Sequence, residues 1–142
     1  KGYDIEYIQS TAEAMAEQRS EQFDIVTCLE MLEHVPDPAA VVQACARLCK
    51  PGGHLYFATI NRNPKSYLFA IIGAEHLLKL VPKGTHRYEK LIKPSELHSW
   101  IRQANLTLQH STGMTYNPIS KEYKLNDRDL DVNYLMHAVK PL

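Results

Sequence analysis

Short apolar runs alternate along the chain with longer segments whose apolar residues recur at helical spacing. Tyr3–Ile8 alternates weakly and predicts a strand, and Ser10 or Thr11 can then cap a helix over Ala12–Arg19. Phe23–Cys28 becomes nearly all apolar toward its end, which is typical of a parallel strand covered on both faces. This order of elements predicts an α/β domain.

The pattern continues with a second helix and a further strand. Asp37 followed by Pro38 is favourable at the start of a helix, and apolar residues then recur at helical spacing as far as Leu48. Pro51-Gly52-Gly53 predicts a turn into a strand over His54–Ile60. Strands separated by helices imply a parallel sheet with right-handed crossovers.

The last part of the chain is less regular. An apolar segment over Tyr67–Val81 is followed by a helix that begins near Pro94 and by a strand over Leu106–Met114. A polar stretch around 117–131 leads to a last strand, Val132–Val139. We expect the final two strands to form the antiparallel end of a mostly parallel sheet.

Composition narrows the classes of function. The 142 residues suit one domain, and 16 basic residues balance 16 acidic ones, so nothing indicates a groove that binds nucleic acid. The three cysteines show no CxxC pairing, which argues against a disulfide framework or a structural zinc site and favours a reducing compartment. No leader peptide opens the chain and no apolar run reaches the roughly 20 residues that span a bilayer. We therefore expect a soluble or peripheral protein.

Candidate chemistry follows the second predicted strand. If the chain turns helically after Cys28, then Glu30, Glu33 and His34 stand at i, i+3 and i+4 and share one face. Ligands of open α/β sheets bind at the carboxyl ends of strands, so the three side chains are candidate metal ligands. A solvated helix surface is the other interpretation, and spacing alone leaves both open.

A nucleotide-binding α/β domain normally opens with a strand, a glycine-rich turn and a helix. The sequence contains no GxGxxG. We expect the chain to begin at the third strand of such a sheet and to lack the amino-terminal part of the fold, including the glycine-rich loop on which activity depends.

Several strings resemble known enzymes. The chain is similar to the second half of class I S-adenosylmethionine-dependent methyltransferases in three strings, Phe23-Asp24-Ile25-Val26, Leu32-Glu33-His34-Val35 and Leu48–Gly53. Three longer strings, Cys28–Pro38, Asn61–Ser66 and Val81–His86, resemble the O-methyltransferases of ubiquinone biosynthesis, as does Asp131-Val132-Asn133-Tyr134 near the end of the chain. The strings run through the whole sequence, so the resemblance covers all of it.

The resemblance implies a Rossmann-like methyltransferase sheet, here a partial domain over 1–142 with an apolar and basic insertion at about 64–92. It implies O-methylation of polyprenylated phenols or catechols, of the 3-demethylubiquinol and 2-polyprenyl-6-hydroxyphenol types, with S-adenosylmethionine as methyl donor. It also implies a ubiquinone-biosynthesis complex as partner. The expected location is the cytoplasm, peripherally on the inner face of the membrane, or the mitochondrial matrix in a eukaryote.

The resemblance also assigns residues. It places a magnesium ion on Glu30, Glu33 and His34, although imidazole suits Mn²⁺, Fe²⁺ or Zn²⁺ better than Mg²⁺. The residues that it places at the cofactor are Thr11, Ala12 and Leu29.

A phenol with a pKa near 10 is almost fully protonated at pH 7, so the reaction needs a metal ion or a base. His34 and His86 are the candidate bases, and Asn61 and Asn63 are candidate substrate contacts. The segment 66–81 either lies in a membrane interface, where it meets the polyprenyl tail, or packs as a helix on its own domain. Two other functions stay open: a non-catalytic fragment or pseudoenzyme that binds lipid or a partner, and methylation of another small molecule.

Overall fold

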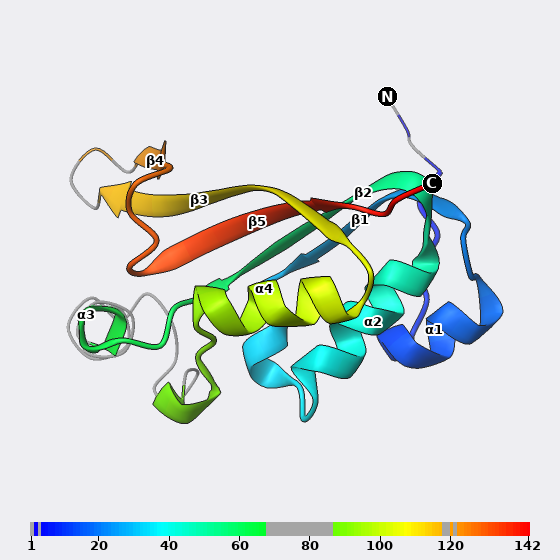
Figure 1. Ribbon diagram of the computed structural model, residues 1–142, viewed down its shortest axis with the longest axis horizontal. Coiled ribbons are helices and arrows are strands. Elements are labelled where there is room, and N and C mark those ends of the chain that lie inside the picture. The colour runs from blue at the N-terminus through cyan, green and yellow to red at the C-terminus, as the bar shows by residue number, and fades with distance from the viewer. Residues whose placement is uncertain (1, 3, 68–86, 118–119, 121) are drawn as a thin grey trace.

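A mixed five-stranded sheet forms the frame of the protein (Figure 1). The computed structural model describes residues 2, 4–67, 87–117, 120 and 122–142. The strands of this part are β1 (Phe23–Leu29), β2 (Cys49–Ile60), β3 (Thr107–Asn117), β4 (Glu122–Asn126) and β5 (Asn133–Val139). Their order across the sheet is β1-β2-β5-β3-β4. β1 and β2 are parallel, whereas β5 pairs antiparallel with β2 and β3, and β4 pairs antiparallel with β3. The α/β fold class and the antiparallel end of the sheet are confirmed.

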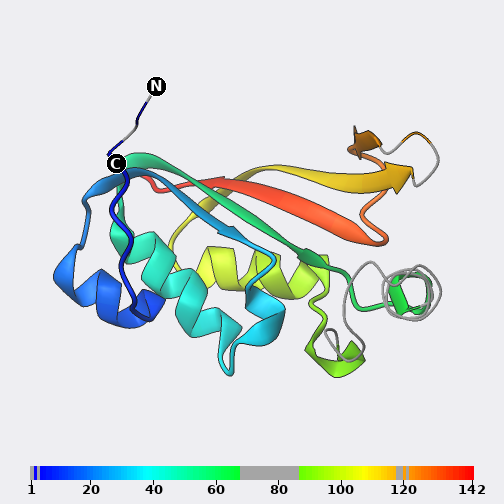
Figure 2. The same ribbon diagram turned by 180° about the vertical axis from the view of Figure 1, so that it is seen from behind.

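The longer helices lie together on one side of the sheet, as Figures 1 and 2 show from opposite directions. They are α1 (Ala12–Gln18), α2 (Pro38–Leu48) and α4 (Pro94–Gln103). Three short helical turns connect the elements: η1 (Leu32–His34), α3 (Pro64–Ser66) and η3 (Tyr88–Lys90). The predicted start signals are confirmed, because the hydroxyl of Thr11 accepts from the amide of Ala14 at 3.2 Å and the carboxylate of Asp37 accepts from the amide of Ala40 at 3.0 Å.

The core fills the space between the sheet and these helices. Alternate residues of β2 point into it, so that Leu55 and Phe57 are 0% and 1% exposed. Val42 from α2 and Leu97 from α4 are fully buried against the same cluster. Burial of this apolar stripe, at about 25 cal/mol per Å² of apolar surface, holds α2 and α4 on the sheet.

Three expectations about the strands are wrong. Residues 4–8 form no strand, since none of the described strands pairs with them and an unpaired strand leaves its backbone groups unsatisfied. β4 lies inside the polar stretch around 117–131, in which the sequence pattern predicts no strand. β1 is not covered on both faces by the described residues, because Ile25 and Leu29 remain 59% and 52% exposed.

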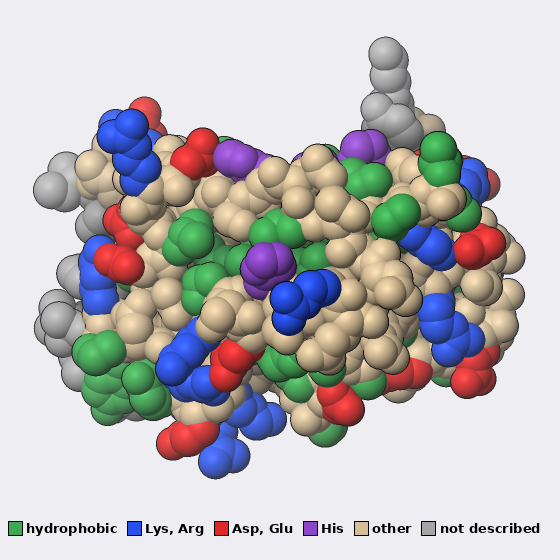
Figure 3. Space-filling model, viewed as in Figure 1, with side chains coloured by type: hydrophobic (Ala, Val, Ile, Leu, Met, Phe, Trp, Pro, Cys, Tyr) green, Lys and Arg blue, Asp and Glu red, His purple; other side chains and the backbone are tan. Residues whose placement is uncertain are grey.

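The surface shows no strong electrostatic bias in the view of Figure 3, where acidic and basic side chains are interspersed. Within the described ranges, no helix is long and apolar enough to cross a membrane. Most of the apolar segment 66–81 lies outside the described residues, as does His86.

Candidate functional site

The carboxyl ends of β1 and β2 lie side by side in parallel register, with Leu29 opposite Ala58. The amide of Glu30 still donates to the carbonyl of Ala58 at 2.9 Å, so the ladder continues to the residue after β1. Glu30 itself has a left-handed backbone, with φ 51°, which turns the chain sharply away from the sheet. This is the edge at which open α/β sheets place their ligands.

The turn after β1 is not the single helical turn that the spacing predicts. The left-handed Glu30 ends the strand, and η1 begins only at Leu32 as a 3₁₀ helix. Glu33 is 2% exposed, whereas the side chain of His34 is exposed. The expectation that Glu30, Glu33 and His34 share one helix face is therefore wrong.

Glu33 is the buried acidic group of this edge. Its Oε2 accepts a hydrogen bond from Oγ1 of Thr59 at 2.7 Å, and Thr59 is itself fully buried near the end of β2. Its Oε1 has no hydrogen-bond partner among the protein atoms and lies away from solvent. A buried polar atom without a partner is costly, at about 1–3 kcal/mol, so this oxygen is a candidate contact for a ligand.

The carboxyl group of Glu30 is electrostatically linked to Glu33. Partial desolvation of its carboxyl group, followed by the nearby charge of Glu33, raises the pKa of Glu30 to about 7. The side chain of Glu30 reaches solvent, which screens part of this repulsion. Two acidic groups thus lie at the same edge, one buried and one exposed.

The three predicted metal ligands do not lie together as a cluster in the described residues. The described residues contain no group of three or more His, Cys, Asp or Glu side chains placed to hold a metal ion. The unpartnered oxygen of Glu33 and the like charge on Glu30 are features that a cation would stabilise. Metal binding by Glu30, Glu33 and His34, with magnesium as the ion, stays a prediction from the sequence.

The predicted cofactor residues occupy two elements. Thr11 uses its hydroxyl to cap α1, and Ala12 is the first residue of that helix and packs against the core. Leu29 is the last residue of β1 and remains half-exposed, so its side chain is accessible at the carboxyl edge. Cofactor contact by these three residues stays a prediction.

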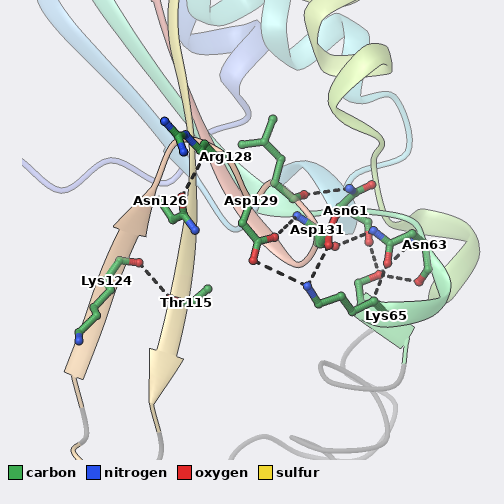
Figure 4. A network of polar contacts seen from close by, with 11 residues as sticks. Asn61, Asn63, Lys65, Thr115, Lys124, Asn126, Arg128, Asp129 and Asp131 are labelled. Carbon is green, nitrogen blue, oxygen red and sulfur yellow. Dashed lines mark hydrogen bonds and ion pairs between the residues drawn. The ribbon is translucent and has the colours of Figure 1, made fainter.

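Asn61 and Asn63, the predicted substrate contacts, take part in a network that joins the end of β2 to the loop before β5 (Figure 4). The side-chain nitrogen Nδ2 of Asn61 donates to the carbonyl of Leu130 at 2.9 Å. Nδ2 of Asn63 donates to the carbonyl of Asp131 at 2.6 Å. The side-chain oxygen of Asn63 also caps α3, accepting from the amide of Ser66 at 2.8 Å. These bonds give both asparagines a structural role, and their contact with substrate stays a prediction.

A charged pair strengthens the same network. Nζ of Lys65 lies 2.8 Å from a carboxylate oxygen of Asp131 and 3.7 Å from one of Asp129. Hydrogen bonding to Asp131 is the main reason that the pKa of Lys65 is raised. The network therefore holds the segment after β2 against the loop before β5, although the two lie far apart in the sequence.

The sequence did not predict the residues that line a cavity beside Glu33. A cavity of about 230 Å³ opens between η1 and the start of α4. Its lining is partly apolar and partly charged: Leu32, Glu33, Val35, Pro36, Pro38, Arg62, Glu89, Lys90, Leu91, Ile92, Glu96 and Trp100. One signal was present, because Thr59 occupies a core-facing position of β2 in alternation with Leu55 and Phe57, where a hydroxyl needs a partner.

Comparison with known proteins identifies the family. Residues 2–111 match the family model described as a methyltransferase domain. The chain belongs to this family. This match confirms the resemblance to methyltransferases that the sequence motifs indicated.

Curated relatives carry a more specific description. The chain is 64% identical over 141 residues to a ubiquinone biosynthesis O-methyltransferase of Hahella chejuensis (strain KCTC 2396), covering 99% of this chain and 59% of the relative. It is 60% identical over 139 residues to the protein of the same description from Pseudomonas fluorescens (strain SBW25), covering 98% of this chain and 60% of the relative. The chain therefore spans about 60% of the length of the curated relatives that it matches.

Solved structures show the same fold. A putative methyltransferase from Bacillus halodurans C-125 superposes with a TM-score of 0.64 at 19% identity, covering 97% of this chain and 78% of that one. Magnesium protoporphyrin IX methyltransferase from Synechocystis PCC 6803, solved with bound SAH, gives a TM-score of 0.58 at 18% identity, covering 93% of this chain and 49% of that one. At these identities the likeness shows the fold, which is Rossmann-like, and nothing finer.

Proposed function

We propose that the protein of this chain is an S-adenosylmethionine-dependent O-methyltransferase of ubiquinone biosynthesis that acts on polyprenylated phenols or catechols. The observation that carries the proposal is the buried, unpartnered Oε1 of Glu33 at the carboxyl edge of the parallel pair β1–β2. Family membership favours S-adenosylmethionine as methyl donor, and the description of the relatives at about 60% identity favours the pathway. The substrate class comes from the sequence motifs.

The reaction requires one displacement and one proton transfer. An oxygen of the acceptor ring attacks the methyl carbon in line, the bond between carbon and the sulfonium sulfur breaks, and its electron pair stays on sulfur. The hydroxyl proton must leave to a base, because a phenol with a pKa near 10 is a poor nucleophile at pH 7. His34 is the candidate base within the described residues, and it lies exposed one residue after Glu33. His86, the second candidate, lies outside them.

Magnesium dependence remains part of the proposal, with no step routed through the ion. A bound divalent ion would lower the pKa of a catechol hydroxyl. Its test is calorimetric titration of Mg²⁺ into the protein and into Glu30→Gln, which keeps the size of the side chain. Loss of a measurable binding heat in the variant would support the site at this edge, and equal heats would place magnesium elsewhere.

We also propose peripheral membrane contact through residues 66–81. A polyprenyl substrate is dissolved in the bilayer, so an enzyme on the inner face of the cytoplasmic membrane, or in the mitochondrial matrix in a eukaryote, would reach it from the surface, within a ubiquinone-biosynthesis complex. Tyr67, the exposed residue of this range that the structure describes, is 45% exposed and packs edge-on against Tyr88 at 5.6 Å. Co-sedimentation with anionic vesicles that Tyr67→Ser weakens would support the contact, and unchanged sedimentation would refute a role for Tyr67.

The direct test of cofactor use is calorimetric titration of S-adenosylhomocysteine. Saturable binding with one site per protein supports methyl transfer. If the complete protein binds none, the fold serves another purpose, and binding of lipid or of a partner becomes the better account.

A further inference from the structure

A larger cavity, of about 400 Å³, lies where α2, the residues after α4 and the end of β5 meet. It belongs to the end of the sheet where β1 and β2 begin, opposite the edge that carries Glu30 and Glu33. Two alanines, Ala46 and Ala104, line it at places where longer side chains would fill the space between α2 and α4. Its volume is within the range of small-molecule pockets, which begins near about 300 Å³.

The residues around this cavity supply hydrogen-bond donors. Arg47 of α2 and Lys140 after β5 are cationic, and the carboxamides of Gln43 and Asn105 add further N–H groups. Gln43 and Arg47 are four residues apart on α2, so their side chains leave the helix on the same face. None of the described residues that line the cavity is acidic. The lining therefore suits an anion that accepts several hydrogen bonds.

The two cations differ in how far they are already paired. Nζ of Lys140 lies 2.8 Å from a carboxylate oxygen of Glu21 and donates to the carbonyl of Cys49 at 3.0 Å. Arg47 is exposed, and its guanidinium forms no hydrogen bond or ion pair with the described residues. Arg47 is thus the group that an incoming anion would pair with, because its planar fork fits two oxygens of one phosphate or carboxylate.

A cation in the last turn of a helix can also serve the helix end itself. Here the carbonyls of these turns are already used by the main chain. The carbonyl of Arg47 accepts from the amide of Glu21 at 2.8 Å, and that of Arg102 accepts from the amide of Asn105 at 3.1 Å. The left-handed backbone of Asn105, with φ 57°, closes the end of α4 in this way. The guanidinium of Arg47 is therefore left to a ligand.

The arrangement of the donors favours phosphate over carboxylate. A carboxylate directs two oxygens in one plane, and a single guanidinium satisfies both. A phosphate group directs its terminal oxygens in several directions, which matches donors that come from α2, from the end of α4 and from the end of β5. Ala46, Ala104 and Pro141 leave apolar surface beside these donors for an organic part of the ligand.

We propose that this cavity binds a small phosphomonoester, with the phosphate paired to Arg47 and the organic part against Ala46, Ala104 and Pro141. The site is separate from the edge assigned to methyl transfer, so the inference goes beyond the proposed function. α3 and the end of β5 lie at opposite ends of the molecule (Figures 1 and 2), so the cavity is also remote from the membrane contact proposed for 66–81. The ligand is therefore a soluble ester and not the headgroup of a lipid.

Calorimetric titration with phenyl phosphate and with inorganic phosphate tests the site. We expect one phenyl phosphate to bind per protein, about tenfold more tightly than inorganic phosphate, because the ring buries apolar surface in the cavity. No saturable binding of phenyl phosphate, or equal affinities for the two probes, would overturn the proposal.

Variants separate the cavity from general attraction between charges. Arg47→Gln should weaken phenyl phosphate binding by about tenfold or more, because a charge-assisted pair is lost. Arg102→Gln is the matched control, since it removes the same charge from the last turn of α4 without lining the cavity, and it should leave the affinity unchanged. Equal losses in the two variants would overturn the proposal.

Ala104→Leu tests the cavity without changing any charge. The longer side chain fills the space, so phenyl phosphate binding should be lost. Full affinity in a folded Ala104→Leu protein would overturn the cavity as the site. Should this variant not fold, as judged by circular dichroism, the comparison of Arg47→Gln with Arg102→Gln decides.

Vesicles that contain phosphatidic acid, a lipid whose headgroup is a phosphomonoester, separate the two sources of such a group. The proposal predicts that Arg47→Gln leaves co-sedimentation with these vesicles unchanged. Co-sedimentation that Arg47→Gln abolishes would make a lipid headgroup the ligand and overturn the soluble ester. Binding of S-adenosylhomocysteine should be the same in Arg47→Gln and its parent, so failure of this site and failure of the proposed function are distinguishable.

Discussion

Oγ1 of Thr59 donates to Oε2 of Glu33 across 2.7 Å, and the two residues are separated by 26 positions in the sequence. The bond joins the end of β2 to the 3₁₀ turn that follows β1, so it connects the two parallel strands at their carboxyl edge. It also decides which oxygen of Glu33 remains without a partner. The chemistry proposed for this edge depends on that arrangement.

Removal of the Thr59 hydroxyl should destabilise the fold. Thr59→Val leaves both buried oxygens of Glu33 without a donor, and we expect the free energy of unfolding to fall by about 1–3 kcal/mol in urea titrations followed by circular dichroism. Thr59→Val combined with Glu33→Leu is the matched control, since replacing both partners by apolar groups is nearly neutral. A Thr59→Val protein as stable as its parent would contradict the assigned hydrogen bond.

Gly113 provides a test of how β3 meets the loop before β5. A Cβ at this position would lie 1.5 Å from the carbonyl oxygen of Asp129, a backbone atom that belongs to the loop held by Lys65. Gly113→Ala should therefore lower the free energy of unfolding by about 3 kcal/mol or more, because backbone must shift to admit the methyl group. Gly2→Ala, whose Cβ meets nothing within 4 Å, is the control. Equal thermal midpoints for the two variants would contradict the described packing.

The histidines on the sheet face opposite the helices predict a dependence of stability on pH. Nδ1 of His54 lies 2.9 Å from Nε2 of His137, and Tyr56 stacks on His137. Burial, followed by the charges of His54 and His110, lowers the pKa of His137 below its usual value. The unfolded chain thus binds a proton more readily at this position, so stability is fully present above the unfolded pKa near 6.5 and is lost as the pH falls below it.

Thermal midpoints measured from pH 7.5 to 5 check this expectation. His137→Gln should flatten the decline on the acid side, whereas His98→Gln, an exposed histidine of α4, should leave it unchanged. The other charged group near these histidines is Asp127, which faces His110. Hydrogen bonds from Thr112 and His110 lower the pKa of the Asp127 carboxyl group. The contribution of Asp127 to stability is therefore lost only at more acidic pH. An identical decline in His137→Gln would show that this histidine does not carry the effect.

Local signals in the sequence predicted the elements well. Thr11 and the Asp37-Pro38 pair start the expected helices, and the alternation of β2 places Leu55 and Phe57 in the core. The same reasoning failed where distant contacts decide. β4 forms because it pairs with β3, with Tyr116 opposite Tyr123, and the polar composition of the stretch did not reveal this partner.

The candidate site shows the same division. Sequence motifs located the edge after β1, but helical spacing assumed that the helix starts at Glu30, where the left-handed backbone instead turns the chain. Glu33 is buried because Thr59 meets it from another strand, and no local pattern encodes such a contact. The sequence predicted that Asn61 and Asn63 contact substrate. In the structure their side-chain amides donate to carbonyls of a loop about 70 residues away.

Transfer of a tritiated methyl group from S-adenosylmethionine to a 2-polyprenyl-6-hydroxyphenol with a short tail tests the central claim most directly. The account predicts a labelled methyl ether whose formation excess S-adenosylhomocysteine suppresses and Glu33→Gln reduces by tenfold or more. Binding of S-adenosylhomocysteine without any labelled ether, or a Glu33→Gln protein with the full rate, would contradict it.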